Sequence, residues 1–136
     1  MRQLMVVAGL AAALVLAGTA GGSAKAASVR IDFRHSNCLQ LQDLRLVRFF
    51  VQLVNVGDSA GAFRSDVHFS WLQGKGGWKD SLSVLKGGQL GVGAHSRKLY
   101  YIDLHADPSK RITACGLRIG STSAVHRIGV LVPANR

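Results

Sequence analysis

One short segment of the sequence has residue types and a spacing suited to metal binding. In Asp103-Leu-His105-Ala-Asp107, a carboxylate, an imidazole and a carboxylate stand at every second position. Alternate residues of a β-strand point to one face, so the three side chains would lie together if the strand continued through the segment. Oxygen and nitrogen ligands of this kind suit a divalent metal. Because Pro108 is expected to end the strand before Asp107, we predict no metal and no cofactor, and Asp103 and His105 remain the residues to examine first.

The sequence does not indicate an enzyme. Nucleophilic catalysis requires a serine or cysteine beside an oriented base, and none of the many serines stands in a nucleophile elbow. The seven acidic residues are all aspartates and are scattered one to a segment, so no carboxylate pair for sugar hydrolysis is evident. The glycine-rich residues 74–77 are followed by no helical pattern, which favours turns over a phosphate-binding loop.

The strongest functional signal in the composition is positive charge. The chain has 17 lysines and arginines against 7 acids. If several basic side chains converge on one face, the protein could bind anionic envelope polymers or lipid head groups, an attraction that salt would weaken. The candidate residues are Arg45, Arg48, Arg97, Lys98, Lys110 and Arg111. Nucleic acid is not expected, because stacking needs exposed aromatic side chains, and Phe49, Phe69, Trp71 and Tyr101 fit inward positions better.

The amino-terminal 26 residues have the features of a secretory signal peptide. Arg2 supplies a positive start, an apolar stretch runs to Ala17, and small residues end in Ala24-Lys25-Ala26. We predict cleavage after Ala26, with Ala20 as the alternative. Acylation of the kind found in lipoproteins needs a cysteine, and Thr19 stands at the corresponding position. The expected mature chain, residues 27–136, has a formal charge of +8, has no transmembrane segment, and is placed in the periplasm or outside the cell.

Export determines how the two cysteines are interpreted. Disulfides persist outside the reducing cytosol, and Cys38 and Cys115 can pair in only one way. We therefore predict a bridge between them, with two separately buried thiols as the alternative. A bridge would place the segment around Cys38 beside the strand that contains Cys115.

Apolar and polar residues alternate with a period of two along most of the remaining sequence, as in half-buried strands. Residues 46–55 are apolar on both faces and predict a central strand. Glycine-rich turns separate the strands, which predicts an all-β, immunoglobulin-like antiparallel β-sandwich of about seven strands. The expected strands are residues 28–35, 46–55, 63–72, 81–86, 98–104, 111–119 and 125–132.

Two short turn motifs resemble those of a known family. Val51-Gln-Leu-Val-Asn55-Val-Gly57, with a later Leu90-Gly-Val-Gly93 segment before a strand, resembles the CARDB domain, a bacterial immunoglobulin-like module named for cell adhesion. The resemblance covers roughly residues 28–132 and implies the sandwich fold with Asn55 and Gly57 as turn-formers. The sequence departs from the family in residues 119–126, which contain no acid, and in its pair of cysteines.

Together these features predict a small, exported, non-catalytic module with a binding or structural role. Its partner would be a protein or an anionic envelope polymer. A periplasmic metal-binding sandwich is a further alternative. We expect recognition at the sandwich ends, in residues 74–78 and 87–95, because loops there carry binding sites in related architectures.

Overall fold

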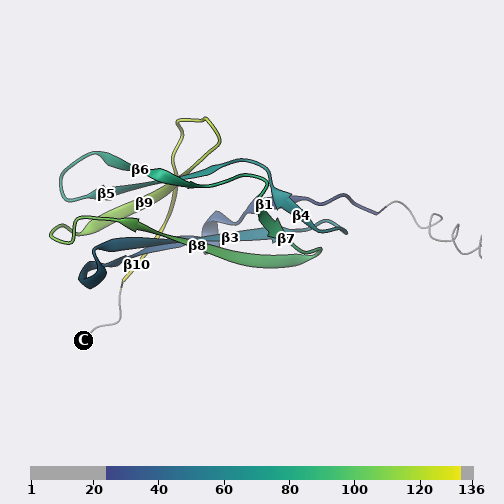
Figure 1. The fold of residues 1–136 in the computed structure, drawn as a ribbon, viewed down its shortest axis with the longest axis horizontal. Helices are drawn as coiled ribbons and strands as arrows, with labels where there is room; N and C mark the ends of the chain where they lie inside the picture. The colour runs from purple at the N-terminus through teal and green to yellow at the C-terminus, as the bar shows by residue number, and fades with distance from the viewer. Residues whose placement is uncertain (1–23, 133–136) are drawn as a thin grey trace, which may run out of the picture.

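The chain folds into a β-sandwich in this computed structural model, which describes residues 24–132 (Figure 1). Within these residues there are ten strands and two short 3₁₀ turns. Their bounds are β1 Val29–Ile31, η1 Phe33–His35, β2 Asn37–Leu41, η2 Gln42–Leu44, β3 Leu46–Asn55, β4 Gly61–Phe63, β5 Val67–Gln73, β6 Trp78–Leu85, β7 Leu90–Val92, β8 Ser96–His105, β9 Ile112–Ile119 and β10 His126–Leu131. The predicted signal peptide falls largely on residues 1–23 and so lies outside the described part of the chain.

The strands form two layers that β10 joins. In one layer β3 pairs along its whole length with β8, and its other edge pairs with β1 and β2. In the second layer β5 lies between β6 and β9. The first half of β10 pairs antiparallel with β9, whereas the second half pairs in parallel with β2. Figure 1 shows β5, β6 and β9 above β3 and β8, with the short β4–β7 pair at one end. The predicted all-β sandwich is confirmed.

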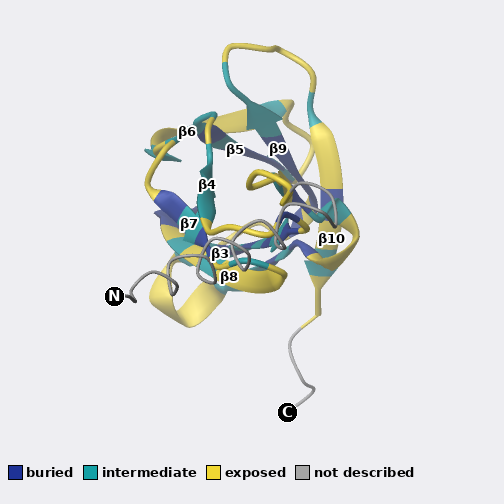
Figure 2. Ribbon diagram, turned by 90° about the vertical axis from the view of Figure 1, so that its right-hand side faces the viewer, coloured by how far each residue is buried: buried dark blue, intermediate teal, exposed yellow. Residues whose placement is uncertain are grey.

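The core lies between the layers, because each strand turns alternate side chains inward. Along β3, Val47, Phe49, Val51 and Leu53 are fully buried, as the alternation predicts. The Phe49 ring centroid lies 4.9 Å from that of Phe69 on β5, so the two layers meet through aromatic rings. The view along the sandwich in Figure 2 shows the buried segments of β5, β9 and β3 directed at this interior.

The predicted disulfide is present. Cys38 on β2 and Cys115 on β9 are bonded, with Cα atoms 6.4 Å apart. Both cysteines are fully buried, and β10 pairs with Cys38 through Val130 and with Cys115 through Ile128. The bond therefore links the two layers beside the strand that they share.

Asn55, at the end of β3, is a buried hydrogen-bonding junction. Its side-chain oxygen accepts hydrogen bonds from the backbone N–H groups of Ser28, at 3.0 Å, and Gly57, at 2.9 Å. Its amide nitrogen donates to the carbonyls of Ser59, Val92 and Gly93, at 2.9, 3.2 and 3.1 Å. One side chain thus joins the start of β1, the β3–β4 turn and the β7–β8 turn, which gives the predicted turn-forming asparagine a wider structural role.

Gly57 is required because its neighbours leave no room for a side chain. Its φ is not positive, since the glycines with positive φ among residues 24–132 are Gly74, Gly88 and Gly120. A Cβ atom on Gly57 would lie 2.1 Å from the carbonyl oxygen of Ala26. The chain before β1 therefore packs directly on this turn, and any side chain at position 57 would displace it.

The strand expected over residues 28–35 is shorter than its alternation suggests. β1 ends at Ile31 and η1 follows, with the Ser36 hydroxyl donating to the Asp32 carbonyl at 2.8 Å. The same hydroxyl accepts from the Gln52 N–H at 2.9 Å, so β3 keeps a hydrogen-bond partner between β1 and β2. Three strands that the sequence analysis did not predict, β2, β4 and β7, complete the sheets.

The strand expected over residues 81–86 begins earlier, at Trp78, and is irregular. Its pairing with β5 shifts between His68 and Ser70. Leu82 lies in the shifted stretch and is fully exposed. Across residues 24–132, no helix combines the length and the apolar character that crossing a membrane demands.

Candidate functional site

The solvent-facing side of the β8–β3 layer, which we call the outer face, is the main candidate site. Residues opposite one another in an antiparallel pair point to the same side of a sheet. Because Val47, Phe49, Val51 and Leu53 point into the core, the other residues of β3 and their partners on β8 form the outer face. Its rows are Leu46 with His105, Arg48 with Asp103, Phe50 with Tyr101, Gln52 with Leu99, and Val54 with Arg97.

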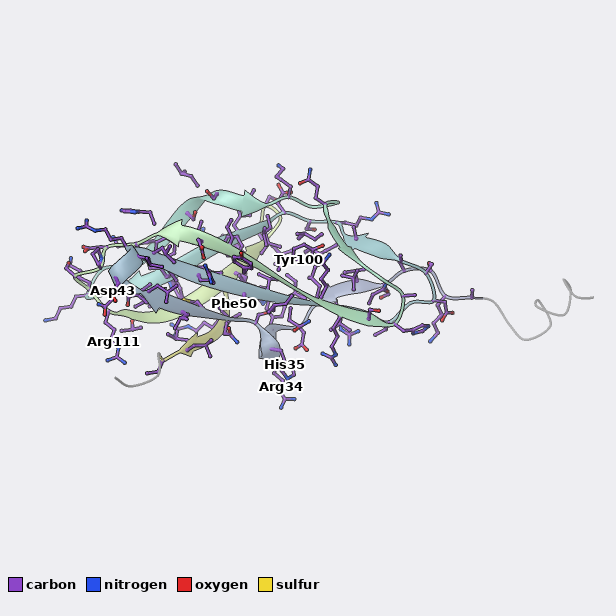
Figure 3. The ribbon with its side chains drawn as sticks, turned by 60° about the horizontal axis from the view of Figure 1, so that its bottom comes forward. Arg34, His35, Asp43, Phe50, Tyr100 and Arg111 are labelled. Atoms are coloured by element: carbon purple, nitrogen blue, oxygen red, sulfur yellow. A yellow bond between two sulfur atoms is a disulfide. The ribbon has the colours of Figure 1, made fainter. Side chains whose placement is uncertain are left out.

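The centre of the outer face is aromatic and apolar. Tyr101 is 59% exposed and Leu99 is 50% exposed, and the half-buried Phe50 lies beside them with its ring centroid 6.4 Å from that of Tyr101. Figure 3 shows Phe50 on β3, in the middle of this side of the molecule. The inward position expected for Tyr101 and the two-sided burial expected for β3 are therefore wrong, because no element of residues 24–132 forms a second layer over this side of the sheet.

Arg48 and Asp103 hold the central tyrosine in place. The guanidinium donates two hydrogen bonds to the carboxylate, from Nε at 2.6 Å and from Nη2 at 2.8 Å. The same guanidinium carbon lies 4.7 Å from the ring centroid of Tyr101. A paired, planar cation over an aromatic face restricts the rotamers of both side chains, so the exposed ring is preorganised for contact.

The ion pair should make a small, pH-dependent contribution to stability. The hydrogen bond from Arg48 holds the pKa of Asp103 below its usual value. A carboxylate whose pKa is lowered by folding stabilises the fold above its unfolded pKa of about 3.9, and this contribution is lost as the pH falls through the folded value. We expect Asp103→Asn to lower the free energy of unfolding by less than about 1 kcal/mol at pH 7, since both side chains are partly exposed.

Urea unfolding of this variant and the wild type at pH 7, 4 and 2 measures the effect. The difference should shrink as the pH falls. Asp43→Asn is the control, because Asp43 makes no ion pair within residues 24–132. A difference for Asp103→Asn that stays constant down to pH 2 would contradict this interpretation.

Arginines form one margin of the outer face. Arg97 lies on β8, and Arg30 on β1 pairs with Val54, so a row of Arg30, Val54 and Arg97 crosses three strands. The Arg97 guanidinium donates to the Asp32 carboxylate at 3.2 Å. Hydrogen bonding to His35, at 2.8 Å, is the main cause of a lowered pKa at Asp32. Figure 3 shows Arg34 and His35 projecting from η1 below the sheet.

The six basic residues predicted to bind anions do not form one patch. Arg48 and Arg97 lie on the outer face, six residues apart along the β3–β8 ladder and so roughly 20 Å from each other. Lys98 points to the opposite side of β8, with its ammonium nitrogen 5.1 Å from the Tyr100 ring centroid. Arg48 and Arg97 are each already paired with an aspartate.

The remaining three basic residues, Arg45, Lys110 and Arg111, gather at one end of the sandwich, which we call the end surface. The Arg45 carbonyl accepts the Ala106 N–H at 3.1 Å, and Gln40 donates to the Lys110 carbonyl at 2.8 Å. These bonds join β2 and the residue after η2 to the loop between β8 and β9. In Figure 3 Arg111 is labelled near Asp43 at this end, so the surface is not purely basic.

The three residues considered for metal binding do not come together. β8 ends at His105, and Asp103 is engaged with Arg48. The Asp107 carboxylate accepts hydrogen bonds from the N–H and hydroxyl of Ser109, at 2.9 and 2.6 Å. Within residues 24–132 no group of three or more His, Cys, Asp or Glu side chains is placed to hold a metal ion.

The exposed apolar side chains of the outer face were not predicted from the sequence. Leu99 and Tyr101 stand in an alternating strand whose other set, Tyr100, Ile102 and Leu104, is also apolar. The one available signal was the strand's basic start, Arg97-Lys98, which is typical of an edge strand with an exposed side.

Comparisons with known proteins add no family. No model of a protein family matches the chain, and no curated protein matches its sequence significantly. Membership of the CARDB family therefore stays a prediction.

Proposed function

We propose that this chain is an exported, non-catalytic binding module that recognises a protein partner through the outer face. The observation that carries the proposal is the exposure of Tyr101 and Leu99 beside Phe50, with arginines at the margins. Tyrosine and arginine are enriched at protein interfaces and supply much of their binding energy. A partner of matching chemistry presents an apolar centre and acidic groups towards Arg30 and Arg97.

Export is part of the proposal. The Cys38–Cys115 disulfide fits an oxidising compartment, since such bonds are rare in the reducing cytosol. The apolar segment that ends at Ala17, followed by Ala24-Lys25-Ala26, would serve as the signal that directs the chain there. An adhesion-like or structural role in the periplasm or outside the cell, as the resemblance to CARDB implies, agrees with a small disulfide-bonded sandwich of this kind.

Site-specific photo-crosslinking in the producing cell tests the proposal. A photoreactive residue at position 99 lies on the outer face, and one at position 82 is more open to solvent but lies on the other layer. We expect a discrete crosslinked species from position 99 and none from position 82. Tyr101→Ser should reduce the adduct from position 99, because it removes the central ring. No adduct at 99, or the same adducts from both positions, would refute a specific binding face.

The end surface supports a second candidate, the binding of anionic envelope polymers or lipid head groups. The Ala106 N–H donates to the Arg45 carbonyl, and the Gln40 and Gln42 side chains donate to the Lys110 and Pro108 carbonyls. These bonds hold Arg45 and Lys110 at the same end of the sandwich, as a binding surface for a polyanion requires. Elution from heparin resin over a salt series tests it. The double variant Arg45→Gln and Arg111→Gln should elute at lower salt than Arg34→Gln with Arg127→Gln, which removes the same charge elsewhere. Equal elution would mean that only net charge matters.

A further inference from the structure

An open, polar surface depression, which we call the cavity, lies on the other layer, on the side of β5, β6 and β9 that faces away from the core. Its volume is about 660 Å³, within the roughly 300–1,000 Å³ of typical ligand sites. His68 and Arg118 form its floor, since they stand opposite one another on β5 and β9. Arg64 borders it on one side, and the β9–β10 loop, through Ser121, borders it on another. The cavity is remote from the outer face, and the inference drawn from it does not depend on the function proposed for the outer face.

The guanidinium of Arg118 is incompletely satisfied. Its side chain is only 27% exposed, and its contact with a carboxylate is a single one, from Nη2 to Asp80 at 3.1 Å. Its Nε–H is buried and has no hydrogen-bond partner within the described chain. Asp80 also accepts a hydrogen bond from Ser70, at 2.5 Å, so its carboxylate is shared. A guanidinium has five N–H donors, and this one has a single carboxylate contact among the described residues, so its accessible donors gain from a ligand that supplies anionic oxygens.

The walls of the cavity are fixed by the backbone. The Asp66 carboxylate accepts the Gly87 N–H at 2.8 Å, and the Asp66 carbonyl accepts the Gly120 N–H at 2.9 Å. A Cβ atom on Gly87 would lie 2.1 Å from the Arg64 carbonyl oxygen, so these segments are in direct contact. One aspartate therefore holds the β4–β5 link, the β6–β7 turn and the β9–β10 loop around the cavity, which is formed before any ligand arrives.

The charge and the hydroxyl groups of the cavity define the class of ligand. Both of its carboxylates are already engaged, Asp66 with Gly87 and Lys86 and Asp80 with Ser70 and Arg118. Arg64 is exposed and makes no ion pair within the described residues. Hydroxyl groups complete the lining, from Ser65, Ser81, Ser121 and Thr122. The cation of Arg64 and the further donors of Arg118, beside several hydroxyls, match a ligand that carries both an anionic group and hydroxyls.

We propose that this cavity binds a hydroxylated anion of monosaccharide size, a sugar acid or a sugar phosphate. The anionic group lies between Arg118 and Arg64, and the sugar hydroxyls exchange hydrogen bonds with the serine and threonine side chains. The guanidinium groups supply charge-assisted hydrogen bonds to the anion, and the neutral hydroxyls distinguish a sugar from a simple ion.

NMR titration of the folded, disulfide-bonded protein with four probes tests the proposal. The probes are glucuronate, glucose 6-phosphate, glucose and inorganic phosphate. We expect saturable shifts of the His68 and Arg118 amide signals with glucuronate or glucose 6-phosphate, and the stronger of these two identifies carboxylate or phosphate as the anionic group. Glucose and phosphate should each bind at least about tenfold more weakly, because glucose lacks the anionic group and phosphate lacks the sugar hydroxyls.

Two variants and one control locate the binding. Arg118→Gln and Arg64→Gln should each weaken the preferred probe about tenfold or more, as expected when a charge-assisted hydrogen bond is removed. Arg64 is exposed, so its replacement leaves the fold intact even if Arg118→Gln destabilises it. Arg127→Gln, on β10 with its guanidinium over Trp78, should bind normally. Absence of saturable binding, phosphate binding as tightly as glucose 6-phosphate, or equal losses in all three variants would overturn the proposal.

Discussion

Replacing Asn55 by alanine is expected to lower the free energy of unfolding by about 3–5 kcal/mol, because the change leaves several buried backbone groups without partners. Asn55 is 1% exposed, and its side chain serves two N–H groups and three carbonyls from three separate segments. Alanine offers no replacement for any of these bonds, and the buried N–H of Gly57 has little access to water.

Urea unfolding monitored by tryptophan fluorescence measures this loss. Asn37→Ala is the control, since Asn37 is a half-buried asparagine whose side chain makes no hydrogen bond within residues 24–132. Asn55→Asp is a second variant that keeps the acceptor oxygen and loses the donor. Its free energy of unfolding should lie between those of the wild type and Asn55→Ala, or be similar to that of Asn55→Ala, because a carboxylate would face three carbonyl oxygens. If Asn55→Ala lost no more stability than Asn37→Ala, the junction would not hold the turns together.

Removal of the disulfide is the second large effect that we expect. The bond closes a loop with a sequence separation of 77 residues, for which the loop-entropy model predicts about 4 kcal/mol of stabilisation. The double variant Cys38→Ala and Cys115→Ala also removes two fully buried sulfur atoms from the core, so cavity formation adds to the loss. We therefore expect this variant to be largely unfolded at 37 °C, or to unfold at much lower urea than the wild type.

Circular dichroism during thermal unfolding, with and without reductant, tests this expectation. Reductant should lower the midpoint of the wild type and leave the double variant unchanged, which separates the loss of the bond from any effect of reductant on the rest of the protein. A wild-type midpoint that is insensitive to reductant under conditions where mass spectrometry shows both thiols reduced would contradict a stabilising role.

The strands that could be predicted from the sequence are those whose alternation is long and bounded by turn residues. β3 has the bounds expected for it, because residues 46–55 form a long apolar stretch, and its residues alternate between buried and half-buried in the structure. The strands that were not predicted are short. β4 and β7 each contain a glycine within three residues, so local propensity does not favour them, and their pairing comes from the segments that bring them together. The period of two also continued through Phe33, where the chain leaves the strand and the ring instead stacks on His126 at 4.6 Å.

The candidate sites were harder to predict, for a related reason. Alternation divides a strand into two sets of side chains, but it does not say which set faces the core when both are apolar. Tyr100 and Tyr101 are such a pair, and Tyr101 is exposed because it lies on the side of the β3–β8 layer that faces away from the core. Arg118 and His68 are far apart in sequence, and their meeting depends on the register between β5 and β9, which composition does not determine. The basic residues were identifiable one by one, whereas their grouping was not.

The parallel pairing of β10 with β2 has a consequence for the order in which the protein can fold. β2 lies near the start of the described chain and β10 near its end, yet β10 supplies the partner for both β2 and β9. Contacts between such distant segments are slow to form, because a long loop must close first. The sandwich therefore cannot close until β10 is present. In a chain that emerges amino terminus first, from a ribosome or a translocation pore, the edges of β2 and β9 stay unpaired until β10 has appeared.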